Sequence, residues 1–241
     1  MKNTLLTIVI TIILLIVGLC GCNQKTEINN INDNNGEENF NKEIPKPDII
    51  DLKLVELEKQ GYYPQLYAAG LVKNIAKVNI NNVTVIIKLL NETKNVIYSE
   101  IKKLHPDIIE PNEYGVFLFR KSVEYHDSVT VEINSFFYTN ETNYKDLILE
   151  NNHIIEKSNQ SFSIEGLIKN RGNNNVSNIT IFIIAYDIED KLLDLGGSNI
   201  IGELNVGQQK YYEASITIFD KWYDVDDIKS TEFKISYNVQ K

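Results

Sequence analysis

The sequence repeats itself at a fixed interval, and this repeat constrains the fold more than any other feature. The residues GLVKN at Gly70–Asn74 return as GLIKN at Gly166–Asn170, an offset of 96 positions (166 − 70 = 96). At the same offset, NVTVIIKLLN at Asn82–Asn91 aligns without a gap with NITIFIIAYD at Asn178–Asp187. Self-similarity over this length indicates two copies of one domain.

Further segments extend the repeat in both directions. DLKLVELEK from Asp51 resembles DLILENNH from Asp146, and IEPNEY at Ile109–Tyr114 resembles LNVGQQKY at Leu204–Tyr211. Each copy ends in a run of alternating apolar and polar residues, at 128–138 and at 230–239. The repeat therefore includes nearly the whole chain after residue 50.

The repeated segments have the composition of β-strands. The runs 83–90 and 179–186 are rich in β-branched and aromatic residues, which favour a buried strand over a helix. Only IYSEIKKL at 97–104 also fits a helical spacing. Units of about 95 residues with about seven short strands suit an immunoglobulin-like β-sandwich. We therefore predict an all-β protein with two tandem Ig-like β-sandwich domains, at residues 48–142 and 143–241.

Four segments of the second copy, within residues 161–218, form a pattern: GLIKN, ITIFIIAYD, KLLD and LNVG. This pattern resembles that of the FxLYD domain family. The namesake positions fall on Ile183, Ala185, Tyr186 and Asp187, so the Phe and Leu of the family are replaced. The first copy, over 65–119, matches less well and has no Tyr-Asp pair. The resemblance implies an extracytoplasmic module, often carried by a lipoprotein, and supplies no catalytic residue.

The repeated positions also have physical interpretations. A glycine in a strand, as at 70 and 166, lets a neighbouring segment approach closely. Asn74 and Asn170 are placed where a strand ends, and asparagine suits turn geometry. Tyr186 can bury its ring and keep its hydroxyl group hydrogen-bonded, and Asp187 can accept backbone N–H bonds in a hairpin. We expect these residues to serve the fold.

The N-terminus has the sequence of a secretion signal. Residues 1–22 contain an early lysine, an apolar stretch and the ending LCGC. That ending resembles a lipobox, which implies cleavage before Cys22 and a lipid on its thiol group. The alternative is an uncleaved helix, although about 15–17 apolar residues are short for a core of about 30 Å. Residues 23–47 are polar and lack periodicity, so we predict a disordered tether.

Charge and cysteine content exclude several classes of function. The formal net charge of −9 disfavours binding to nucleic acid, which requires a basic surface, and docking on anionic lipid. Both cysteines, Cys20 and Cys22, lie in the signal segment. The rest of the chain therefore has no disulfide and no thiolate metal site, and we expect no cofactor.

FDKWYDVDD at 219–227 is the segment most suggestive of a binding site, because it contains the only tryptophan. Asp224, Asp226 and Asp227 can offer oxygen ligands to calcium, although no glycine turn or distal Glu completes an EF-type loop. Trp222 and Tyr223 can instead stack on a sugar or a peptide. The third interpretation is an acidic loop in which Trp222 plugs the edge of the sandwich.

Other polar and aromatic residues give weaker signals. Tyr62 and Tyr63 offer a contact surface if they are exposed, or else mark a strand that leads to Gly70. The three histidines lie in loop-like contexts without metal-ligand spacing, so we expect isolated surface side chains. Six Asn-x-Ser/Thr sequons occur, of which three are expected to be the most exposed and open to glycosylation: Asn140, Asn159 and Asn175.

Together these observations predict a lipid-anchored protein on the outer face of a prokaryotic cell membrane. We expect it to be non-enzymatic and to serve an envelope-structural role or bind a protein partner. The alternative is a receptor for a solute or a glycan that uses the surface Tyr and Trp side chains. A genuine enzyme would need carboxylates or histidines clustered in one cleft.

Overall fold

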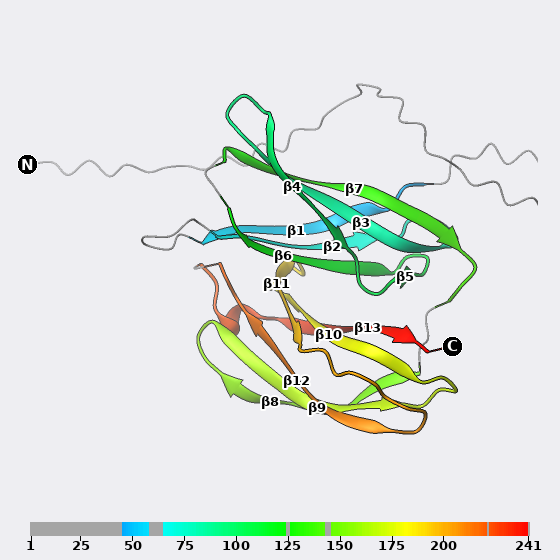
Figure 1. The fold of residues 1–241 in the computed structure, drawn as a ribbon. Helices are drawn as coiled ribbons and strands as arrows, with labels where there is room; N and C mark the ends of the chain where they lie inside the picture. Colours follow the sequence, from blue (N-terminus) through cyan, green and yellow to red (C-terminus); the bar gives the residue numbers. More distant parts are fainter. Residues whose placement is uncertain (1–44, 58–64, 124–125, 143–145, 221, 241) are drawn as a thin grey trace, which may run out of the picture. The chain divides into compact units, whose positions relative to one another are not determined.

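The computed structural model describes residues 45–57, 65–123, 126–142, 146–220 and 222–240, which are built almost entirely of antiparallel strands (Figure 1). The all-β prediction is confirmed. The segment 97–104, whose sequence also fits a helical spacing, lies mostly in strand β4 (Val96–Lys103). Among these residues no helix has the length and apolarity needed to cross a membrane, and the apolar stretch near the N-terminus lies outside them.

The first half of the described chain is a sandwich of two sheets. One sheet has the order β1-β2-β6; in the other, β4, β5 and β7 all pair with β3. Their bounds are β1 Asp48–Leu57, β2 Gln65–Lys73, β3 Asn79–Leu90, β4, β5 Ile108–Ile109, β6 Tyr114–Ser122 and β7 Ser128–Thr139. The inward residues of these sheets form one apolar core, which includes Leu66, Val85, Ile87 and Phe117.

The second half repeats this arrangement. Strands β8-β9-β12 form one layer and β11-β10-β13 the other, around a core that includes Ile168, Ile181, Ile183 and Ile216. The bounds are β8 Leu147–Lys157, β9 Ser161–Asn170, β10 Val176–Tyr186, β11 Leu192–Ser198, β12 Gln209–Thr217 and β13 Ser230–Val239. A short 3-10 helix, η1 (Val225–Asp227), precedes β13.

Backbone conformation repeats together with topology. Asn82 and Asn178, which lie at equivalent register shifts within the aligned strands β3 and β10, both have positive φ, at 48° and 51°. Lys94 and Asp190, again 96 positions apart, have φ of 64° and 61° in the equivalent hairpins. Because L-residues rarely adopt this region, its recurrence at matched positions supports two copies of one structural unit.

The asparagines of the repeated phrase make the same set of buried hydrogen bonds within each half. Asn170 is fully buried; its Nδ2 donates to the carbonyls of Asn174 (2.8 Å) and Leu204 (3.1 Å), and its Oδ1 accepts from Gly172 N at 3.0 Å. Asn74, also fully buried, makes the equivalent bonds to Val78 O, Ile109 O and Ala76 N, at 2.8, 2.9 and 3.0 Å. The predicted strand-end position is confirmed, and the side chain additionally links three chain segments.

The glycines of the phrase accommodate a cross-strand aromatic ring. A Cβ atom on Gly70 would lie 2.4 Å from Cε1 of Phe117, its partner on β6. On Gly166 it would lie 3.0 Å from Cε1 of Tyr212, the equivalent partner on β12. The close approach predicted for these positions is therefore confirmed. At Gly166 strand β8 makes it as well, because the Cβ atom would lie 2.5 Å from Asn152 Oδ1 and 3.0 Å from the backbone oxygen of Glu150.

The two halves differ at one edge of the sandwich. In the second half β11 pairs briefly with β12, through Gly197↔Ser215 and Ser198↔Ala214, so that all six strands form one curled sheet. A Cβ atom on Gly196 would lie 2.1 Å from Ser215 O, which shows how closely the strands meet. The equivalent position in the first half is Glu100 (196 − 96 = 100), which bonds to Lys121 of β6 instead.

A third apolar cluster joins the halves. Its members come from the outer faces of β2, β6, β10 and β11: Tyr67, Ala69, Leu71, Val116, Phe182, Ile184, Leu192 and Leu195. Strand β2 alternates, with Leu66, Ala68 and Val72 facing the first core, and Tyr67 and Leu71 facing this cluster. The four layers therefore stack with a continuous apolar interior, and the described residues of both halves form one compact unit (Figure 1).

Candidate functional sites at and near the junction of the two halves

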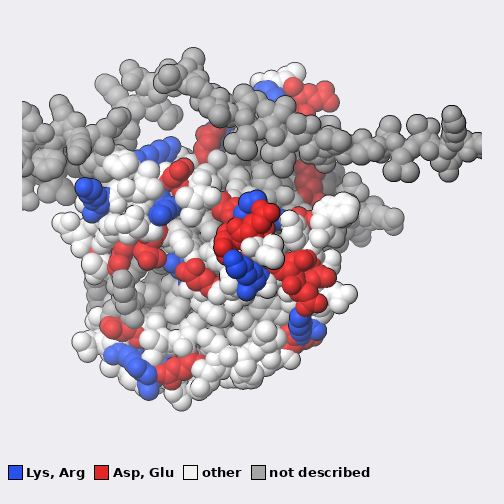
Figure 2. All heavy atoms as spheres, turned by 180° about the vertical axis from the view of Figure 1, so that it is seen from behind, with Lys and Arg blue, Asp and Glu red and all other residues white. Residues whose placement is uncertain are grey.

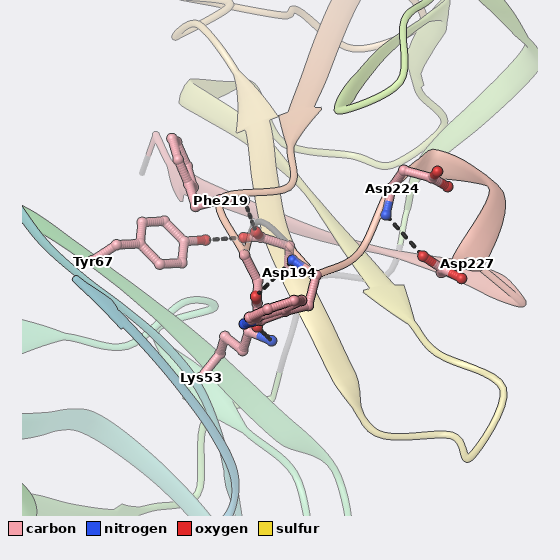
Figure 3. Close-up of polar contacts among 8 residues, drawn as sticks. Lys53, Tyr67, Asp194, Phe219, Asp224 and Asp227 are labelled. Carbon is pink, nitrogen blue, oxygen red and sulfur yellow. Dashed lines mark hydrogen bonds and ion pairs between the residues drawn. The ribbon is translucent and has the colours of Figure 1, made fainter. Parts of the chain in front are cut away.

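A buried tyrosine–aspartate pair forms the polar centre of the junction. Tyr67 of β2 points its hydroxyl group at the carboxylate of Asp194 of β11 and donates a hydrogen bond to it (Figure 3). The backbone N–H groups of Leu195 and Phe219 also donate to this carboxylate, at 2.7 and 3.0 Å. Burial raises the pKa of Asp194, and these hydrogen bonds partly oppose that shift. Burial is also the main cause of the raised pKa of Tyr67.

Strand β1 adds two polar links beside this pair. Lys53 Nζ lies 2.7 Å from Asp220 Oδ2 and 4.7 Å from the centroid of the Tyr223 ring. Asp51 Oδ2 accepts a hydrogen bond from Leu192 N at 2.6 Å. Because all of these contacts cross between the halves, they fix one sandwich on the other.

A second set of hydrogen-bonded side chains lies at another part of the junction. Tyr114 of β6 donates to Glu232 of β13, and its hydroxyl oxygen is 2.8 Å from that of Tyr186. This bonding confirms the hydroxyl partner predicted for Tyr186. Nearby, His105 stacks on Phe182, with ring centroids 5.1 Å apart, and its Nδ1 lies 2.8 Å from Ser236 Oγ. Burial lowers the pKa of His105.

A cleft of about 310 Å³ opens next to this second set of side chains. The first half contributes the segment around β5, with Ile108 and Tyr114 in the wall. The second half contributes Leu147 at the start of β8, and three side chains of β13: Phe233, Ile235 and Tyr237. Apolar and aromatic side chains line the cleft together with the charged Glu110, Glu113 and Lys234, and polar and apolar atoms contribute nearly equal shares of its surface. A cleft that combines apolar walls with a few polar groups can accept a ligand.

The loop that contains the only tryptophan divides into an exposed and a structural part. Trp222 is 81% exposed, so it does not plug the edge of the sandwich. Tyr223 is half-buried against the second core and lies under Lys53. Of the two aromatic residues predicted to contact a ligand, Trp222 is therefore the more accessible.

The carboxylates of the same loop have structural partners. Asp224 accepts from Asp226 N, and Asp227 accepts from Asp224 N, which together cap η1 (Figure 3). Asp226 pairs with Lys157 at 2.5 Å. Within the described part of the chain, no group of three Asp, Glu, His or Cys side chains is placed to hold a metal ion. Asp187 has a similar role: its Oδ1 accepts from the N–H groups of Glu189 and Lys191, as predicted for the hairpin.

The histidines differ from the sequence expectation. His153 is an exposed side chain, as expected, and pairs with Glu165 at 2.7 Å. His126 is only 8% exposed and lies 2.9 Å from Glu56, and His105 is part of the junction, so the prediction of isolated surface histidines is wrong for both. Both lie in segments whose sequence indicates a loop, which concealed the burial created by the fold.

The remaining sequence predictions concern modification and contact residues. Asn140, Asn159 and Asn175 are exposed, as expected; glycosylation stays a prediction. Cys22, Tyr62 and Tyr63 lie outside the described residues. On the face shown in Figure 2, acidic and basic side chains lie next to one another, and the described residues of that face form no continuous basic surface.

Sequence comparison gives no further information on identity. No protein-family model matches the chain, and neither does a curated protein. The features of this protein that indicate a function are therefore the N-terminal sequence, the cleft and the exposed loop.

Proposed function

We propose that the protein is a lipoprotein on the outer face of a prokaryotic cell membrane, anchored through Cys22, which binds a protein partner and catalyses no reaction. The observation that carries this proposal is the N-terminal sequence, in which an apolar stretch ends in LCGC. The polar segment 23–47 then provides a tether between the lipid and the folded domains.

Two features of the folded part support a binding role over an enzymatic one. The largest pKa shifts belong to Tyr67 and Tyr114, whose hydroxyl groups donate across the junction to Asp194 and Glu232. Such pairs are a structural use of buried polar groups. The cleft beside Tyr114, by contrast, is open and combines apolar side chains with charged ones, as binding sites do.

We also propose that the second half is a member of the FxLYD family. Support comes from the roles of the residues that carry the resemblance: Asn170 links three segments, Asp187 closes the hairpin, and Tyr186 bonds across the junction. All three are determinants of the fold, as the resemblance implies.

The anchor can be tested with two cysteine variants. Cys22→Ala is expected to abolish incorporation of an alkyne-labelled fatty acid and to leave the signal segment uncleaved, because the acylated thiol is lost. Cys20→Ala is the matched control and should retain the label, since Leu19 makes that position a poor acylation site. Labelling of Cys22→Ala at the wild-type level would refute the proposed anchor.

The exposure of Trp222 favours one alternative function, a receptor for a solute or glycan. Aromatic side chains stack on sugar rings, so a bound oligosaccharide should shift the emission of this single tryptophan. Titration of the full chain with a panel of envelope oligosaccharides tests this alternative, and emission unchanged by every one of them counts against it.

A further inference from the structure

The cleft lies along the free edges of the second sandwich. In its sheet, β13 and β8 are the outermost strands, so each has one edge without a strand partner in the sheet. Three successive residues of β13 line the cleft: Phe233, Lys234 and Ile235. Because successive side chains of a strand point to opposite faces of its sheet, the cleft must lie along the edge of β13. In the first half the equivalent strands, β1 and β7, approach each other. In the second half the cleft lies between β8 and β13.

The charged groups of the cleft favour a basic ligand. Glu110 and Glu113 line it, as does Lys234, and Glu232 contacts Lys234, so the described charged side chains in and beside the cleft are three carboxylates and one ammonium group. Lys234 Nζ lies 3.0 Å from Glu113 and 3.4 Å from Glu232, and 4.1 Å from the centroid of the Tyr114 ring. The wall thus already holds one cation between carboxylates and an aromatic face, and carboxylates outnumber ammonium groups among the described side chains in and beside the cleft, which favours a basic ligand over an acidic one.

We propose that this cleft binds an extended peptide segment of a protein partner, in which apolar residues alternate with lysine or arginine. The segment adds as a strand to the free edge of β13, so backbone hydrogen bonds provide affinity. Its apolar side chains fill the space between Phe233, Ile235 and Leu147, and its basic side chains meet Glu110 and Glu113. The inference rests on the proposed function, because it identifies the chemistry of the protein partner proposed there.

The test uses the full chain in detergent and a fluorescein-labelled peptide with four Lys-Val repeats. Binding is measured by fluorescence anisotropy against two control peptides, one with glutamate in place of lysine and one with two central prolines. The prolines remove backbone donors needed for strand pairing. Each control peptide is expected to bind at least about tenfold more weakly.

Two isoleucine variants locate the site. Ile108→Arg places a bulky cation in the cleft and should weaken binding by about tenfold or more. Ile101→Arg is the matched control: Ile101 is 55% exposed on β4 and does not line the cleft, so affinity should stay within about twofold. Glu113→Lys, at an exposed side chain, should weaken binding of the lysine peptide and strengthen that of the glutamate peptide.

Absence of binding, equal binding of the three peptides, or equal effects of the two isoleucine variants would overturn the proposal. The assay in detergent does not require the lipid. Failure here with normal acylation of Cys22 therefore removes only the peptide site, and loss of acylation with intact peptide binding removes only the anchor.

Discussion

Asn170→Asp is expected to lower the free energy of unfolding by about 3–5 kcal/mol, although the two side chains have the same shape. The substitution replaces an amide that donates to the carbonyls of Asn174 and Leu204 by an oxygen that faces them. Because the side chain is fully buried, the new carboxyl group must be ionised without donors at that oxygen or be protonated. Urea denaturation followed by circular dichroism measures the loss.

Asn173→Asp is the control for this substitution. Asn173 lies in the same turn but is exposed, so the same chemical change should alter stability by less than about 0.5 kcal/mol. Asn74→Asp should match Asn170→Asp, since its bonds are equivalent. If Asn170→Asp and Asn173→Asp proved equally stable, the buried role of the repeated asparagine would be refuted.

Asp194→Ala is expected to lower the free energy of unfolding by about 2–5 kcal/mol. It removes the carboxylate that accepts from the Tyr67 hydroxyl group and from the Phe219 N–H group, and leaves the Tyr67 hydroxyl group only the more distant Leu195 O (3.1 Å) as an acceptor. Asp226→Ala, at an exposed carboxylate paired with Lys157, is the control and should cost less than about 1 kcal/mol. A similarly small loss for Asp194→Ala would mean that the junction contributes little to stability.

The pH dependence of stability gives a separate signature of Asp194. The pKa of its carboxyl group is raised on folding, so the native state binds a proton more tightly than the unfolded state. Stability from this group is therefore fully present below the unfolded pKa and is lost as pH rises through the folded pKa. Denaturation midpoints measured across this range should fall with pH in the wild type, and the fall should be smaller in Asp194→Ala.

Strand content and the repeat could be predicted because each depends on local pattern. The apolar alternation of 230–239 and the aligned runs 83–90 and 179–186 all form strands. Strand β2 contains a further signal, which concerns the junction of the two halves. In β2 all seven residues between Gln65 and Lys73 are buried, which requires cover on both faces of the strand.

The polar parts of the junction could not be predicted from sequence. Asp194 stands in KLLDLGG, where an aspartate is typical of an exposed strand end. Its counterpart in the first half is Tyr98 (194 − 96 = 98), so the repeat gave no indication of its role. The partner, Tyr67, is 127 residues distant in sequence, and only the packing of one sandwich on the other brings the two together.

The cleft was likewise hidden, because it depends on the positions of edge strands. Ile108 and Tyr237 each belong to patterns that predict ordinary strand packing. Their exposure to a common cleft follows from the separation of β8 and β13, which side-chain periodicity does not report. Trp222, in contrast, was identified from composition alone, and the structure decided between its predicted environments.

The central claim is that two copies of one sandwich have joined through a shared apolar cluster into a single cooperative unit. Hydrogen–deuterium exchange of the full chain in increasing urea, followed by mass spectrometry, tests it most directly. Peptides from β3 and β10, at the centres of the two halves, should lose protection at the same urea concentration. Loss of protection at two well-separated concentrations would show that the halves fold independently and would contradict the claim.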